Sequence, residues 1–208
     1  VIKITRDRYV DFYAVGDKLQ SISIENNAFT FLENDLPEDI IKMNRQKPSN
    51  ICRRFTHNNL IKFVNHIIPF NKYNLIPIEP YNSDDNKNEC IQFIEGDTIY
   101  ATDRDENIIN AEVKKLMKLY KYEVEEFKRK PNDFLIVTPF VNKNPLVEAF
   151  NNAIREYWIK KVDDNTYTKY CFFHKSDTGT TIDLSESDNE TRIVSIHSSK
   201  GDGRPVVF

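Results

Sequence analysis

The sequence predicts an α/β protein with a mostly parallel sheet that is flanked by helices on both faces. One observation is a set of short, uninterrupted apolar runs such as "FLIVT" at residues 134–138, which are typical of buried strands. The other is that segments with apolar residues at helical spacing lie between these runs. Because buried strands that alternate with helices occur mainly in parallel sheets, the pattern favours that architecture.

In the first half of the chain, the apolar run at residues 10–15 predicts a strand, which a Gly-Asp pair ends. Apolar side chains recur at helical spacing over residues 60–68, so we expect a helix there, ended by Pro69. The polar stretch "YNSDDNKNE" at residues 81–89 predicts a solvated loop. Residues 90–94 predict a second strand.

In the second half, a one-sided apolar stripe predicts a long helix from about residue 106 to residue 129. The strand at residues 134–138 follows it. A second stripe predicts a helix over residues 146–157. The remaining strands are expected at residues 170–173, 192–196 and 205–208.

The composition favours an intracellular protein with a packed core. Of 208 residues, 39% are hydrophobic and 29% are charged; the net charge of −3 neither indicates nor excludes nucleic acid as a partner. No apolar run reaches the roughly 20 residues that span a bilayer, so no membrane association is expected. The three cysteines form no C-x-x-C pair, which predicts a reducing compartment, cytoplasm or nucleus, and no metal site.

Two polar segments directly follow expected strands. "GDKLQS" at residues 16–21 follows the first strand, and "HSSKGDG" at residues 197–203 follows the strand at 192–196. Ligands of parallel α/β sheets bind at the carboxyl ends of strands. Both segments therefore lie where a binding site is expected.

Three stretches, in order, resemble motifs of superfamily 1 DNA helicases of the UvrD/Rep/PcrA type. "AVGDKLQSI" at residues 14–22 resembles the third motif, roughly V-G-D-x-x-Q-S-I. "CRRFTHNNLIKFVNHII" at residues 52–68 is similar to the fourth, an Arg-Ser-Thr stretch before a helix that carries an Asn. "SIHSSKGDGRPVVF" at residues 195–208 resembles the fifth, roughly T-x-H-x-x-K-G-L-E-x-P-V-V-F.

The resemblance implies a RecA-like fold and a motor that uses ATP with Mg²⁺ to move on single-stranded DNA and to separate duplex DNA. It implies that residues 1–35 end a first RecA-like domain and that residues 36–208 form most of a second. No G-x-x-x-x-G-K-[ST] pattern occurs in the sequence. We therefore expect this chain to be a fragment, with the phosphate loop and the Mg²⁺ ligands outside it, and to be inactive as an ATPase alone.

The resemblance assigns ATP-site roles to three residues. Gln20 would sense the γ-phosphate and Arg54 would act as an arginine finger. Asp17 would link the ATP site to DNA. From the residues alone, the favoured interpretation of Gln20 is a polar residue at a strand exit. Asp17 can simply cap a helix, and Arg53 is an alternative to Arg54.

In motif five the resemblance implies that Ser195, His197 and Lys200 contact DNA phosphates. Gly201 and Gly203 would let the backbone approach the nucleotide closely. The usual Lys-Gly-Leu-Glu is Lys-Gly-Asp-Gly here, so the Glu that contacts the nucleotide sugar is missing. Its role is either unfilled or taken by Asp202. A lone His is also often structural.

Departures from the family pattern leave alternatives open. After Gln-Ser-Ile, the usual DNA-stacking aromatic and its Arg are replaced by Glu25 and Asn26, and such variants look like the divergent helicases of large DNA viruses. One alternative is a helicase-derived, non-catalytic module that binds nucleic acid or protein. Another is a nuclease domain, for which Glu89, Glu95 and Asp97 form a weak acidic set.

Overall fold

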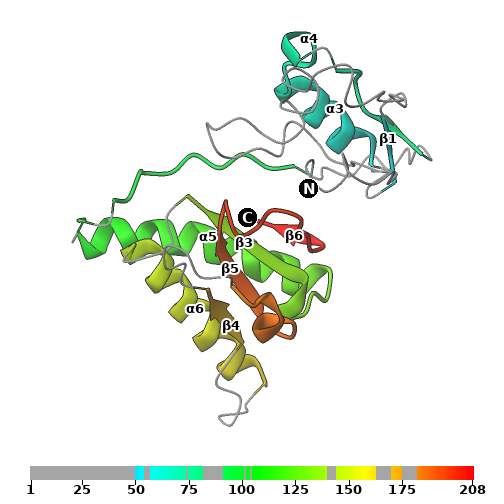
Figure 1. The fold of residues 1–208 in the computed structure, drawn as a ribbon. Coiled ribbons are helices and arrows are strands. Elements are labelled where there is room, and N and C mark those ends of the chain that lie inside the picture. Colours follow the sequence, from blue (N-terminus) through cyan, green and yellow to red (C-terminus); the bar gives the residue numbers. More distant parts are fainter. Residues whose placement is uncertain are drawn as a thin grey trace, which may run out of the picture. The chain divides into compact units, whose positions relative to one another are not determined.

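The computed structural model describes residues 50–53, 57–73, 75–81, 91–100, 102–103, 105–139, 144–162, 170–174 and 182–208. This part of the chain divides into two compact units, with the boundary in the sequence between Glu95 and Gly96. The expected strand at residues 10–15 and the expected domain boundary after residue 35 lie outside the described residues. Each unit is α/β, with parallel strand pairing (Figure 1).

The first unit contains a small parallel strand pair beside a helix. Its elements are strand β1 (Ile51–Cys52), helix α3 (Asn58–Ile67), helix α4 (Phe70–Tyr73) and strand β2 (Glu79–Pro80). Helix α3 ends before Pro69, as predicted. The side-chain amide of Asn65 in α3 donates to Ile78 O at 2.9 Å and accepts from Ile78 N at 2.8 Å. This pair of bonds fixes the segment that leads into β2 against the helix.

The second unit contains a four-stranded, fully parallel sheet in the order β4-β5-β3-β6. Its elements are helix α5 (Glu106–Glu126), 3₁₀ helix η2 (Pro131–Asp133), strand β3 (Phe134–Thr138), helix α6 (Pro145–Val162), strand β4 (Cys171–Phe173), 3₁₀ helix η3 (Leu184–Ser187), strand β5 (Thr191–Ser195) and strand β6 (Val206–Val207). The prediction of a mostly parallel sheet with alternating helices is confirmed for this unit, and its strands lie within a residue or two of their predicted ranges.

Side chains set the ends of the two long helices. Asp105 caps α5, because its Oδ1 accepts from the N–H groups of Asn107 and Ile108 at 3.0 and 3.4 Å. After α5, Lys128 takes a positive φ of 56°, a left-handed conformation that ends helices. Asn144 caps α6, and its Nδ2 also donates to Ile99 O at 3.1 Å.

Both long helices pack on one face of the sheet. Tyr120 of α5 stacks on Phe134 of β3 at 4.1 Å between ring centroids, and Phe150 of α6 meets Tyr120 edge to face at 6.5 Å. Ile193 of β5 is fully buried in the same cluster. We expected helices on both faces; on the other face, the described residues include buried Leu135 and Val194 and a polar network around Arg192, which joins the strand to 3₁₀ helix η3.

A buried chain of hydrogen bonds joins α5, α6 and β5 within this core. Trp158 Nε1 donates to the hydroxyl of Tyr120 at 2.8 Å, and that hydroxyl lies 2.6 Å from Thr191 Oγ1. Thr191 donates in turn to Pro131 O at 3.0 Å. Tyr120 therefore accepts from Trp158 and donates to Thr191, so each member has a partner.

The predicted strand at residues 90–94 is wrong over residues 91–94, which form extended chain with no ladder. Phe93 is 83% exposed and Ile94 47% exposed. The run is apolar enough to resemble a strand, but no described strand pairs with it. Phe93 instead lies 5.7 Å from Phe63, between ring centroids.

Candidate nucleic-acid interface

The motif-five segment begins where an inner strand of the sheet ends. Strand β5 pairs with β3 up to Thr138 and Ser195, and Ile196 N then donates to Thr138 O at 3.0 Å. Residues 196–201 form turns that lie beyond this carboxyl end. This is the edge at which parallel sheets bind ligands, so the segment lies where the sequence predicted a site.

Hydroxyl groups and backbone hydrogen bonds shape the turn. Ser199 N donates to Ser195 O at 2.9 Å, and Ser198 N donates to Ser195 Oγ at 3.3 Å. Asp202 N closes a further turn onto Ser199 O at 2.9 Å. Gly201, with a φ of 85°, supplies the left-handed residue that this path requires.

The structure separates the three predicted DNA contacts into two kinds. His197 and Lys200 are exposed on the turn, where they can meet a ligand. Ser195 is only 7% exposed, and its hydroxyl lies 3.0 Å from that of Ser198. Ser195 therefore holds the turn together, and its side chain does not face solvent.

Arg192 is a buried cation on the sheet face opposite α5 and α6. Its Nε donates to Ser187 Oγ at 2.6 Å, and its Nη2 donates to Leu184 O at 2.7 Å. Its Nη1 donates to Asp202 Oδ2 at 2.8 Å, and its Nη2 also reaches Asp188 Oδ1 at 2.9 Å. Every nitrogen of the guanidinium thus has a partner, as a buried charge requires.

Asp202 is engaged with the protein itself. Its second oxygen, Oδ1, accepts from Gly203 N at 2.9 Å. Burial raises the pKa of Asp202, but the hydrogen bonds from Arg192 and Gly203 and the charges of Arg192 and Arg204 outweigh it, so the pKa lies below its ordinary value. The role of Asp202, Gly201 and Gly203 toward a nucleotide stays a prediction, and the carboxylate is not free for it in this conformation.

Arg204 fixes the segment that returns from the turn. Its guanidinium donates to the carbonyl oxygens of Phe134 at 3.2 Å, Ser187 at 2.6 Å and Glu190. These carbonyls lie near the starts of β3 and β5. The segment therefore runs from the carboxyl end of β5 back across the sheet before β6 begins.

His174 completes this polar layer. Its Nε2 lies 2.7 Å from Ser187 Oγ, the same oxygen that accepts from Arg192. Burial, and then the positive charge of Arg192, lowers the pKa of His174. The sequence did not single out this network, since pairing Arg192 with Asp202 requires knowing how the chain returns after β5.

The predicted ATP-site residues Asp17, Gln20 and Arg54 lie outside the described residues. Arg53, the alternative to Arg54, is described: its guanidinium carbon lies 4.0 Å from the ring centroid of Tyr81. Both side chains are exposed at the carboxyl ends of β1 and β2. This cation–π pair was not predicted, because nothing in the sequence places Tyr81 beside Arg53.

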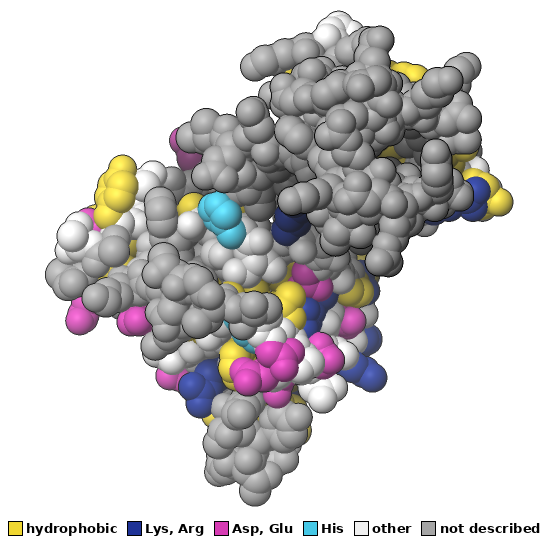
Figure 2. Space-filling model, in the orientation of Figure 1, with side chains coloured by type: hydrophobic (Ala, Val, Ile, Leu, Met, Phe, Trp, Pro, Cys, Tyr) yellow, Lys and Arg dark blue, Asp and Glu magenta, His cyan; other side chains and the backbone are white. Residues whose placement is uncertain are grey.

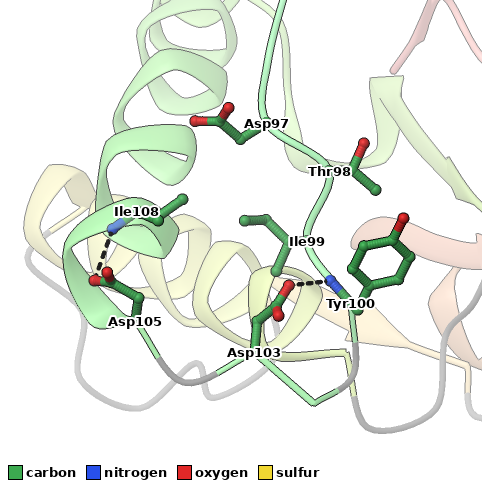
Figure 3. A pocket seen from close by; sticks show the side chains of 7 residues that line it. All are labelled: Asp97, Thr98, Ile99, Tyr100, Asp103, Asp105 and Ile108. Atoms are coloured by element: carbon green, nitrogen blue, oxygen red, sulfur yellow. Dashed lines mark hydrogen bonds between the residues drawn. The ribbon is translucent and has the colours of Figure 1, made fainter.

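A cavity of about 370 Å³ lies at the start of α5, between the helix and the extended segment before it. Asp97, Asp103 and Asp105 line it, with Tyr100 N donating to Asp103 Oδ2 at 2.5 Å (Figure 3). Among the described residues, no group of His, Cys, Asp or Glu side chains is arranged to hold a metal ion. The acidic lining would repel phosphates, so the cavity does not fit a DNA backbone.

Charge on the second unit is mixed. Figure 2 shows acidic side chains gathered on the described part of one face, with Lys and Arg side chains among them. Around η3 the exposed acids are Asp183, Glu186 and Asp188. A nucleic-acid backbone is therefore better accommodated at the turn, with its exposed His197 and Lys200, than around η3.

No helix in the described ranges combines the length and apolar character needed to cross a membrane. Comparison of the chain with protein-family models found no match, and comparisons with curated proteins and with solved structures found no significant match. The motifs and the geometry of the site are therefore what indicates a function for this chain.

Proposed function

We propose that this chain is part of an ATP-dependent superfamily 1 DNA helicase and contributes a surface that contacts the backbone of single-stranded DNA. The supporting observation is the motif-five turn, which follows an inner strand of a parallel sheet at its carboxyl end. Three helicase-like motifs in the expected order give the turn its context.

In this proposal His197 and Lys200 contact DNA phosphates, because they are the exposed polar side chains of the turn. Ser195 stabilises the turn through the hydrogen bond between its hydroxyl and that of Ser198. Gln20 and Arg54 would act on ATP from opposite sides of a cleft between RecA-like domains, and Asp17 would connect that site to DNA. The described residues offer no Mg²⁺ site, so the proposal assigns them no role toward the metal.

The second candidate is a helicase-derived module that binds nucleic acid without hydrolysing ATP. One observation favours it: the carboxylate of Asp202 is held by Arg192 rather than free for a nucleotide sugar. Both candidates share the DNA contact at the turn. They differ in whether the protein that carries this chain hydrolyses ATP when DNA is present.

Binding of single-stranded oligodeoxythymidine over a salt series tests the shared contact. The double variant His197→Ala/Lys200→Ala should bind more weakly, and the slope of log K against log salt should become shallower by about one to two, because two phosphate contacts are lost. Lys118→Ala is the matched control, since it removes a similar charge from the exposed side of α5. Equal affinity and slope in the double variant and the control would refute the contact.

A further inference from the structure

The turn is attached to the sheet by an ion pair that little water reaches. Arg192 Nη1 and Asp202 Oδ2 are 2.8 Å apart, and their side chains are 6% and 14% exposed. Arg192 lies within β5, before the turn, and Asp202 lies just after it. A charge-assisted hydrogen bond with so little solvent is stronger than an exposed one.

Arg192 cannot follow Asp202 if the turn moves. The remaining nitrogens of its guanidinium are fixed by Ser187 Oγ and Leu184 O, at 2.6 and 2.7 Å. The ion pair is therefore a fixed point for the turn rather than a flexible contact. Arg204 provides a second fixed point two residues later, through three backbone carbonyls.

His197 and Lys200 lie between these fixed points and Ser195. The motif that the segment resembles has Leu where this chain has Asp202, so the buried pair is a feature of this chain. The Asp in this chain's Lys-Gly-Asp-Gly, which stands in place of the Leu in the usual Lys-Gly-Leu-Glu, is thus the residue that bonds to Arg192.

We propose that Arg192 and Asp202 are positioning residues that hold the turn at residues 196–201 in the shape that binds single-stranded DNA. The proposal deepens the function proposed above and rests on it. A loosened turn would have to be ordered when DNA binds, and that loss of freedom weakens binding. The pair thus acts on affinity through His197 and Lys200 without touching DNA itself.

The test compares Asp202→Asn with Asp188→Asn, in affinity for single-stranded oligodeoxythymidine at constant salt. Both variants remove one negative charge and both turn an ion pair of Arg192 into a neutral contact at most, but Asp188 is 68% exposed and lies outside the turn. Loss of one negative charge increases the long-range attraction of the protein for DNA by a similar amount in both variants. We expect Asp202→Asn to bind about tenfold more weakly than Asp188→Asn, which corresponds to about 1.4 kcal/mol.

Trypsin cleavage after Lys200 provides a readout that does not depend on DNA. Lys200 is exposed, whereas Arg204 precedes Pro205 and resists trypsin. Cleavage should be faster in Asp202→Asn than in Asp188→Asn, at a temperature where both have the circular dichroism of the parent. If Asp202→Asn does not fold, Asp202→Glu against Asp188→Glu makes the same comparison with no change of charge.

The outcomes separate the two claims. Equal affinity and equal cleavage in the matched variants would overturn the positioning role. Faster cleavage with unchanged DNA affinity would show that the pair holds the turn but would overturn the DNA contact, and with it the proposed function. Weaker binding together with faster cleavage supports both.

Discussion

Tyr120→Phe removes a single oxygen atom from the middle of the buried hydrogen-bond chain between α5, α6 and β5. The indole N–H of Trp158, now 2.8 Å from that oxygen, would be left without its acceptor. Thr191 keeps its bond to Pro131 O and loses only the donor. A buried, unsatisfied donor costs about 1–3 kcal/mol, so we expect the free energy of unfolding to fall by about 2 kcal/mol.

Urea unfolding followed by tryptophan fluorescence measures this change in stability, and the signal comes from the affected residue, because Trp158 is the one tryptophan of the chain. With a typical denaturant slope of about 2 kcal/mol/M, the midpoint should fall by about 1 M. Tyr122→Phe is the matched control: Tyr122 is in the same helix but 50% exposed, and its substitution should change stability by less than about 0.5 kcal/mol.

The same variant should also change how stability depends on pH above pH 10. Burial raises the pKa of Tyr120 far above its ordinary value. Above pH 10 the unfolded chain therefore loses this proton while the folded chain keeps it, and stability falls as the pH rises. Tyr120→Phe should remove this part of the pH dependence. The reasoning is refuted if Tyr120→Phe unfolds at the same urea concentration as Tyr122→Phe and keeps the parent's alkaline slope.

Three further results are expected. Gly201→Ala places a side chain at a φ of 85° and should weaken single-stranded DNA binding and speed trypsin cleavage after Lys200, because the left-handed conformation costs about 1–2 kcal/mol for residues other than glycine; unchanged values in both assays would contradict the role given to the turn. Stability should fall as the pH drops below 6.5, because the pKa of His174 is lowered in the folded state and the unfolded state therefore takes up the proton first. His174→Gln should flatten this part of the plot of urea midpoint against pH. A plot identical to the parent's would contradict this role of His174. In an intact protein with a phosphate loop, Arg54→Ala should lower kcat for ATP by about 10³-fold with poor rescue by Lys, whereas loss of activity in Arg53→Ala alone would move the finger to the neighbouring residue.

The elements with long, regular patterns could be predicted from the sequence. Strand β3 has the predicted bounds, and α5 begins at the predicted residue, because an apolar run between polar residues and a one-sided stripe each allow few alternatives. Residues 91–94 were misassigned, since the run is mostly apolar but Phe93 and Ile94 are exposed. Apolar character alone does not supply a strand partner.

Part of the candidate site could also be predicted. The turn after β5 follows from the strand's end, and the exposure of His197 and Lys200 agrees with a contact role. The buried position of Ser195 and the ion pair of Arg192 could not be read from the sequence. Both depend on how residues 196–205 fold back across the sheet, which involves contacts between residues far apart in the chain.

The strand order of the second unit has a consequence for protein synthesis. β5 lies between β4 and β3 in the sheet, although it follows both in the chain. While the ribosome is still making the residues before Thr191, neither β3 nor β4 has a described strand to pair with, and both leave edges of unpaired backbone N–H and C=O groups beside apolar side chains. Unpaired edges of this kind are sites of aggregation and of chaperone binding. Nascent chains stalled before residue 191 should therefore retain chaperones, and chains stalled after β5 has left the exit tunnel should release them.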